Sequence, residues 1–234
     1  METMWLRVRA PFAAFRGFQA GVYRATSPVM PPSTAYGLIL NLAGIEMRGL
    51  MNGVTTEIRN GLPRLRIAVG AISTPELSTI YQQLHSYPVG ASGKELSART
   101  HGAKFWITPV RRELLVGYDG MIGVQSEDGG LLERARKGLR GELDSPRYGL
   151  PFAGDNNLLI DRIDFLDEPL PVYWYARIQP DDPPRKGSCR LTVGINRTDN
   201  SRTTSLLCAP LAESQSKPPE TAWVWTPTEP VNDF

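Results

Sequence analysis

The sequence has few of the residues on which most hydrolytic and metal-dependent active sites are built. Its 234 residues include two histidines, His85 and His101, and two cysteines, Cys189 and Cys208. Two distant thiols make neither a disulfide framework nor a zinc site with ligands at the usual spacing. The chain has no Walker-type phosphate loop and no nucleophile elbow, and these histidines assemble no convincing serine triad. Zinc enzymes, P-loop hydrolases and serine hydrolases are therefore not indicated.

Long apolar runs are also missing. The longest stretch, residues 35–45, is interrupted by Asn41 and is too short to span a bilayer. Residues 1–15 alternate apolar and basic side chains and lack the apolar block of a signal peptide. We therefore expect a cytoplasmic protein with no membrane partner.

Glycine, proline and an uneven distribution of charge are what the chain does have. Its 22 glycines and 20 prolines favour many turns and short strands, and 41% hydrophobic residues are enough for a folded core. Residues 1–112 carry a net charge of +8, whereas residues 113–234 carry −6. This division favours a polyanionic partner for the first half and a basic partner for the second, unless the two halves mix in space.

Hydrophobic periodicity predicts an α+β fold. Residues 5–10 alternate as a strand that Pro11 ends, and an ordered loop follows to Met30. A helix then begins at residues 31–34 (PPST), with Ser33 or Thr34 as its N-cap, and ends near Gly44. The later patterns predict strands at 64–72, 105–107, 114–116, 122–124, 158–166, 171–178 and 188–196, a turn at 118–121, a short helix at 76–84 and a longer one at 130–143.

The order of these elements resembles a ferredoxin-like αβ sandwich, the fold of many RNA-binding (RRM-like) domains. In such domains the sheet face and the neighbouring loops stack and hydrogen-bond single-stranded RNA. The proline-rich tail after Pro210 is expected to pack through Trp223 and Trp225 rather than to fold independently.

Three segments resemble one protein family. They are residues 10–16 (APFAAFR), residues 23–45, in which PPSTAYGL is the most specific part, and residues 148–157 (YGLPFAGDNN). Together they are similar to the fifth Cas family of CRISPR-associated proteins, which belongs to the RAMP superfamily and contributes a subunit to type I Cascade. The resemblance covers most of residues 1–170.

This resemblance implies a ferredoxin-like RAMP domain at 1–170, with a β-hairpin thumb inserted at about 73–102, and a β-rich extension at 171–234. It also implies a non-catalytic subunit, without a cofactor, that holds the 5′ handle of the crRNA. The expected protein partners are the backbone subunit and the large subunit of Cascade, and target DNA is met only through the complex. We further expect acidic residues of the second half, such as Asp161 and Asp164, to contact the large subunit.

Basic and hydroxyl side chains of the first half are the candidate RNA ligands. They are Arg16, Arg24 and Thr26 in the first loop, Ser33 and Thr34 at the helix start, Arg64 and Arg66 on a strand, and Lys94, Arg99, Thr100, His101 and Lys104 on the expected thumb. Each has a simpler alternative, because helix caps and solvated charges need no RNA. Among the neighbouring aromatics, Phe12 and Phe15 are expected in the core.

Two enzyme classes and one non-enzymatic class remain as alternatives. A metal-independent endoribonuclease that processes precursor crRNA would use His101 and Lys104 with a tyrosine such as Tyr36. However, cleaving relatives are expected to carry an adjacent lysine and histidine, which this chain lacks. A metal hydrolase would draw on the acidic residues at 155–168, namely Asp155, Asp161, Asp164, Asp167 and Glu168, whose spacing fits no metal-binding loop. The third alternative is a protein-interaction module that binds no RNA.

Overall fold

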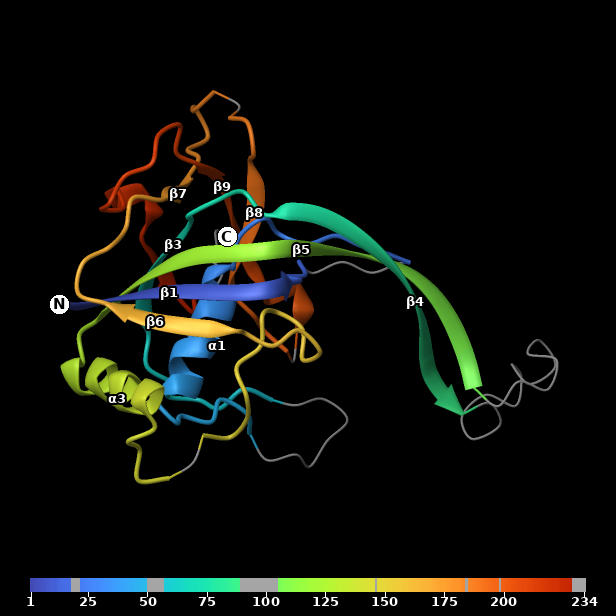
Figure 1. Cartoon of the computed structure of the whole chain (residues 1–234), viewed down its shortest axis with the longest axis horizontal. Helices are drawn as coiled ribbons and strands as arrows, with labels where there is room; N and C mark the ends of the chain where they lie inside the picture. The colour runs from blue at the N-terminus through green and yellow to red at the C-terminus, as the bar shows by residue number, and fades with distance from the viewer. Residues whose placement is uncertain are drawn as a thin grey trace.

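The computed structural model describes residues 1–17, 22–49, 57–88, 105–145, 147–183, 185–197 and 199–228. Its centre is an antiparallel sheet of four strands with two helices on one face (Figure 1). The strands are β1 (Glu2–Ala13), β3 (Leu65–Ala71), β5 (Phe105–Ser126) and β6 (Arg162–Leu166), paired in the order β6-β1-β5-β3. Helix α1 (Pro32–Leu42) connects β1 to β3, and α3 (Gly129–Arg140) connects β5 to β6.

The main core lies between this sheet and the helices. Every second residue of β1 from Met4 to Ala10 is buried, as the sequence alternation predicts. These side chains share one cluster with Ile39 and Leu42 of α1 and with Leu132 of α3. Burial of this apolar surface holds both helices on the same face of the sheet.

A tryptophan cluster covers the opposite face. The ring of Trp5 on β1 lies 6.0 Å from that of Trp174 on β7 and 5.9 Å from that of Trp223 in the C-terminal segment. The tail therefore packs through Trp223, as expected. The additional elements are β7 (Tyr173–Arg177), β8 (Cys189–Gly194), β9 (Thr204–Pro210), β10 (Val224–Thr226) and the short 3-10 helices Asn200–Arg202 and Glu220–Ala222. Because Trp174 and Trp223 cover this face at Trp5, the bases of an RNA cannot stack on the sheet there.

A long hairpin formed by β4 (Glu76–Pro88) and the first half of β5 projects from the sheet (Figure 1). The short helix expected at 76–84 is therefore wrong. Thr79, Ile80 and Tyr81 favour a strand, and residues 76–84 pair with residues 108–116 without a register break. Pairing with the long β5 strand determines the structure of this segment, and the local helical periodicity does not.

β5 also runs without interruption through the turn that the sequence predicts at 118–121. That prediction is wrong because β1 pairs with all of residues 118–121, and β3 pairs with residues 120 and 121 on the other edge. The Asp119 carboxylate accepts hydrogen bonds from Arg7 of β1 at 2.9 and 2.6 Å. These contacts hold Asp119 in the strand rather than at a turn.

Pro11 does not end β1, which continues to Ala13. Gly117, at a φ of 68°, lies across from Pro11 between two regular residue pairs. Beyond this point the buried positions shift by one, so that Ala13 is buried while Phe12 is 47% exposed. The prediction that Phe12 belongs to the core is therefore wrong. The same prediction for Phe15 is confirmed, because it is buried and its ring meets Tyr118 edge-on.

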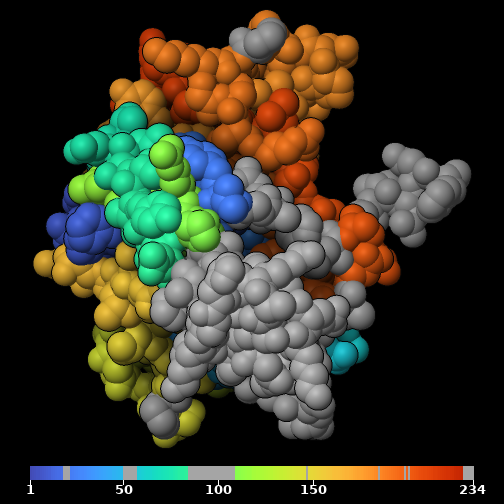
Figure 2. All heavy atoms as spheres, turned by 90° about the vertical axis from the view of Figure 1, so that its right-hand side faces the viewer, coloured from blue at the N-terminus to red at the C-terminus, as the bar shows by residue number. Residues whose placement is uncertain are grey.

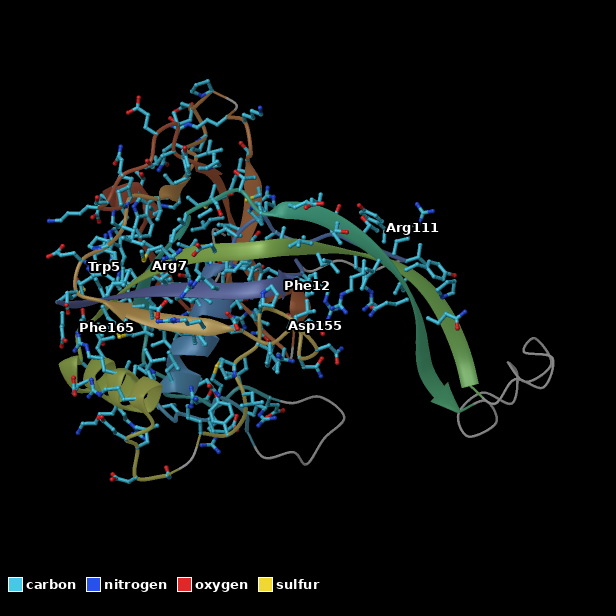
Figure 3. The ribbon with its side chains drawn as sticks, in the orientation of Figure 1. Trp5, Arg7, Phe12, Arg111, Asp155 and Phe165 are labelled. Atoms are coloured by element: carbon cyan, nitrogen blue, oxygen red, sulfur yellow. The ribbon has the colours of Figure 1, made fainter. Side chains whose placement is uncertain are left out.

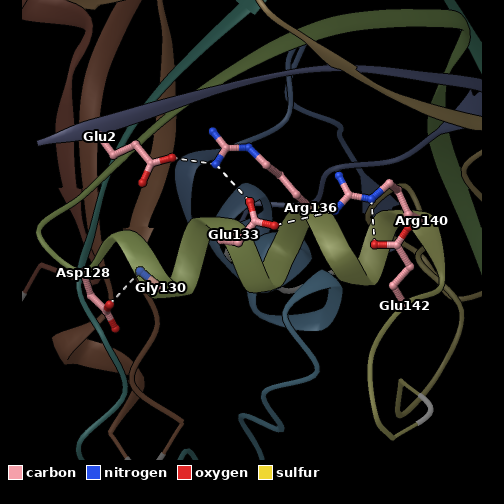
Figure 4. Close-up of polar contacts among 7 residues, drawn as sticks. All are labelled: Glu2, Asp128, Gly130, Glu133, Arg136, Arg140 and Glu142. Atoms are coloured by element: carbon pink, nitrogen blue, oxygen red, sulfur yellow. Dashed lines mark hydrogen bonds and ion pairs between the residues drawn. The ribbon is translucent and has the colours of Figure 1, made fainter.

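The two helices begin in different ways. Pro31 is the N-cap of α1 and its carbonyl accepts the amides of Thr34 and Ala35, so the predicted side-chain cap by Ser33 or Thr34 is wrong. In α3, Asp128 accepts the amide of Gly130 at 2.9 Å. Figure 4 shows this cap and the ion pairs along α3, in which Arg136 reaches Glu2 of β1 and Glu133. The helix predicted at 130–143 is confirmed, although it ends at Arg140.

No helix among the described residues is long and apolar enough to cross a membrane.

Thr226 provides a first prediction. Its side chain is almost fully buried and, within the described chain, its hydroxyl has no hydrogen-bond partner. Thr226→Val should therefore raise the free energy of unfolding by about 1 kcal/mol, since it removes an unsatisfied buried group without changing the shape. Thr204→Val is the matched control, because the Thr204 hydroxyl donates to the Thr228 carbonyl at 2.6 Å and its loss should destabilise the protein. Urea denaturation distinguishes the two, and an equal loss in both variants would contradict the prediction.

Candidate nucleic-acid interface at the neck of the hairpin

Three strands meet where the hairpin leaves the body of the protein. The short strand β2 (Tyr23–Arg24) pairs with one edge of β5, and β4 pairs with the other. We call this region the hairpin neck; it comprises β2, residues 79–82 and residues 110–113. Figure 2 views the molecule from the hairpin side, with the C-terminal residues at the top and those near residue 150 below.

Residue pairing separates two faces of the neck. Arg111 lies opposite both Tyr23 and Tyr81, whereas Arg112 lies opposite both Arg24 and Ile80. Paired residues share a face and consecutive residues alternate, so the two rows lie on opposite faces. Arg111 is exposed and Arg112 is buried, whereas Ile80, which shares the face of Arg112, is 37% exposed.

An arginine cluster forms around Asp155 on the buried side of the neck. The Arg112 guanidinium forms an ion pair with the Asp155 carboxylate, and both side chains are more than 90% buried. Arg112 also donates to Gln82 at 3.3 Å, and Arg16 lies 3.9 Å from the same carboxylate. Arg16 and Arg24 interact electrostatically, so the cluster combines three arginines with one carboxylate. Figure 3 shows Asp155 beside the end of β1, where Phe12 lies.

The electrostatics of this cluster favour an anion. Burial, followed by the charges of Arg112 and Arg24, lowers the pKa of Arg16. Burial alone would raise the pKa of Asp155, but hydrogen bonds from the Asn157 amide and from Arg112, with the charges of Arg112 and Arg16, lower it overall. Asp155 thus stays ionised and is paired with Arg112. The positive charges of Arg16 and Arg24 are available to a phosphate. The side chain of Arg16 is 42% exposed, so a ligand can reach it.

Thr26 has a structural position in this neighbourhood. Its hydroxyl accepts the Phe15 amide at 2.8 Å, and its own amide donates to Glu113 at 2.9 Å. The chain therefore already engages both of these groups of Thr26, which fix the loop that carries Arg16 and Arg24.

The other predicted ligands lie elsewhere. Ser33 and Thr34 line a groove of about 690 Å³ between α1, residues 57–62, residues 148–154 and the segment 193–197. Arg64 lies over the ring of Trp225, and Arg66 lies over Trp223 and forms an ion pair with Glu220. Lys94, Arg99, Thr100, His101 and Lys104 fall outside the described residues.

The described residues provide no site for either of the two enzymatic alternatives. Tyr36 is buried, its hydroxyl donates to the Pro63 carbonyl at 2.8 Å, and burial raises its pKa to about 12. Its proposed partners, His101 and Lys104, are not described. Asp164 is held by Arg9 at 2.9 Å and by Arg162 at 2.6 Å. Within the described ranges, no three potential metal ligands come together.

Sequence reasoning missed Arg111, Arg112 and Tyr81. The signal that could have identified them is the Arg111-Arg112 pair within a strand, because such a pair must place one charge on each face. The resulting partners, Asp155 and Tyr81, could not be recognised without the register and the loop geometry.

A family model and one fold comparison agree with the resemblance in the sequence. A chain from a CRISPR RNA-guided surveillance complex superposes with a TM-score of 0.57 at 12% identity, covering 94% of this chain and 96% of that one. A crystal structure of a Cas protein superposes with a TM-score of 0.43 at 13% identity, covering 90% of this chain and 94% of that one. A search of curated proteins finds no match. A family model described as CRISPR-associated protein (Cas_Cas5) matches residues 3–140, more than half of the chain. The protein therefore belongs to the Cas5 family of CRISPR-associated proteins.

Proposed function

We propose that this chain is a non-catalytic, cytoplasmic subunit of a type I CRISPR surveillance complex that binds the 5′ handle of the crRNA. The observation that carries the proposal is the arginine cluster of Arg16, Arg24 and Arg112, which has one carboxylate for three positive charges. The similarity in fold to a chain of an RNA-guided surveillance complex supports it. We also propose that the chain joins the backbone and large subunits of the complex.

The strand order supports a ferredoxin-like core. In sequence the elements follow β1-α1-β3-β5-α3-β6, and in the sheet the strands follow β6-β1-β5-β3 with every neighbour antiparallel. This is the order of a split βαβ fold with one strand inserted after β3. We assign this core to residues 1–170, with the β4–β5 hairpin as the thumb. Residues 171–234 form the extension, whose strands continue the same sheet.

The arginine cluster suits a phosphate backbone for a physical reason. Single-stranded RNA carries one negative charge per nucleotide, and binding to arginine releases the counterions condensed on it. Arg112 is fixed by Asp155 and supports the cluster, while the more exposed Arg16 and the half-buried Arg24 contact the phosphates. The basic residues proposed on the thumb, from Lys94 to Lys104, would extend this contact along the RNA.

A salt titration of RNA binding tests the proposal. The full chain is titrated into a labelled RNA that carries the repeat-derived 5′ handle, between 50 and 300 mM salt. The variant Arg16→Ala/Arg24→Ala should bind about 100-fold more weakly, since each charged hydrogen bond contributes about a factor of ten. The slope of log K against log salt should also become shallower by about 1.4, because two phosphate contacts are lost.

Arg134→Ala/Arg140→Ala is the matched control. It removes the same charge from exposed positions of α3, away from the neck, and should leave the slope unchanged. An unchanged affinity and slope in the Arg16/Arg24 variant would reject the proposed site. Cleavage of the RNA by the unmodified chain without metal would instead support the ribonuclease alternative.

A further inference from the structure

The exposed face of the hairpin neck carries a row of two tyrosines and an arginine. Tyr23 on β2, Arg111 on β5 and Tyr81 on β4 are direct neighbours across the three strands. Tyr23 is 49% exposed and Tyr81 is 66% exposed, and Arg111 between them is also exposed. We call these three residues the tyrosine row. Figure 3 shows Arg111 on the projecting part of β5.

Tyr23 is held in place although it is outside the core. Its hydroxyl donates to Glu113 Oε1 at 2.5 Å, and Glu113 Oε2 accepts the Thr26 amide at 2.9 Å. The amide of Arg111 donates to the Val22 carbonyl at 2.7 Å, which fixes β2 against β5. The row is thus preorganised: a ligand that stacks on Tyr23 does not first have to order this ring.

Charge and shape suggest the kind of ligand. Arg111 forms no ion pair with any residue that the structure describes. The Glu113 carboxylate lies two residues further along the same face, where the Tyr23 hydroxyl and the Thr26 amide donate to it. The two tyrosines flank β5 on either side, which places their backbones about 10 Å apart at two strand spacings. Two exposed tyrosines separated by an exposed arginine match the bases and phosphates of a single strand.

We infer that the tyrosine row is a stacking platform for unpaired bases of single-stranded RNA. This inference rests on the proposed function, because it assigns the bases of the same RNA whose phosphates meet the arginine cluster. Tyr23 and Arg24 are consecutive residues on the edge strand β2 and point to opposite faces. An RNA strand that passes around this edge meets arginines on one face and tyrosines on the other. One face of the neck would thus bind the RNA phosphates, and the other face would bind the bases.

Substitution of Tyr81 tests the platform. Stacking of one base on an aromatic side chain corresponds to about a 5- to 100-fold change in affinity. Tyr81→Leu should therefore weaken binding of the handle RNA to the full chain by this factor, and Tyr81→Phe should bind as the unmodified chain does. The salt slope should be the same in all three proteins, because stacking releases no counterions. RNA with 2-aminopurine at successive handle positions should show quenching at one or more positions that Tyr81→Leu abolishes.

The result distinguishes this inference from the function on which it rests. If Arg16→Ala/Arg24→Ala weakens RNA binding but Tyr81→Leu does not, the inferred stacking platform is rejected. The proposed RNA site at the arginine cluster is then retained. If neither variant changes binding, the proposed function fails as well. If Tyr81→Leu leaves RNA affinity unchanged but prevents assembly with the other subunits, the row is a protein contact, which also overturns the inference.

Discussion

Gly138→Ala should destabilise the protein by more than about 3 kcal/mol, although alanine is the better helix former. In an exposed helix this substitution would stabilise by about 1 kcal/mol. Gly138 lies in α3 where this helix crosses α1, and a Cβ added there would overlap the carbonyl oxygen of Leu42. The methyl group can fit only if the two helices separate, which would open the main core. The urea midpoint and the melting temperature measure the effect.

Gly17→Ala is the appropriate control for this prediction. A Cβ added at Gly17 meets nothing within 4 Å, and its φ does not lie in the left-handed region. It should therefore change the stability by less than about 1 kcal/mol. A Gly138→Ala variant as stable as this control would show that the helix crossing is looser than the structure indicates.

Asp155→Ala should cost about 3–5 kcal/mol of stability, because it leaves the Arg112 charge buried and unpaired. Both side chains of the pair are more than 90% buried, and Asp155 also accepts the amide of Asn157 at 3.0 Å. In contrast, Asp161→Ala removes a carboxylate from an exposed position and should have little effect. The double variant Arg112→Met/Asp155→Ala should recover part of the loss, since neither charge is then left alone. No recovery would mean that Asp155 stabilises the loop without Arg112.

The same pair predicts how stability depends on pH. The folded state lowers the pKa of Asp155 below its unfolded value of about 3.9. Its contribution is therefore fully present above the unfolded pKa and is lost as the pH falls through the folded pKa. Urea unfolding between pH 3 and 7 should show a decline in stability at the acidic end, and this decline should be smaller in Asp155→Asn. An identical decline in both proteins would assign it to other carboxylates.

Local patterns predict those elements whose structure depends on near neighbours. The alternation of β1 and the spacing of apolar residues in α1 and α3 identify these elements correctly, because one buried face requires a period of two or 3.6. The incorrect predictions concern residues whose structure depends on contacts with segments distant in the sequence. Residues 76–84 form a strand because β5 pairs with them, and Phe12 is exposed because the buried positions shift at Pro11 and Gly117.

The candidate site shows the same division. Arg16 and Arg24 are recognisable from a basic loop with aromatic neighbours, whereas Arg112 needs Asp155, which lies 43 residues further along the chain.

By itself, the sequence determined the family, the α+β composition and the basic character of the first half. These properties depend on residue identity and short-range order, which can be read along the chain. The tertiary structure alone decided that Tyr23, Arg111 and Tyr81 share a row, that Arg112 is neutralised by Asp155 and that tryptophans cover the second face of the sheet. Each of these depends on strand register and on contacts across long loops, and a register shift of one residue would send every side chain of a strand to the other face.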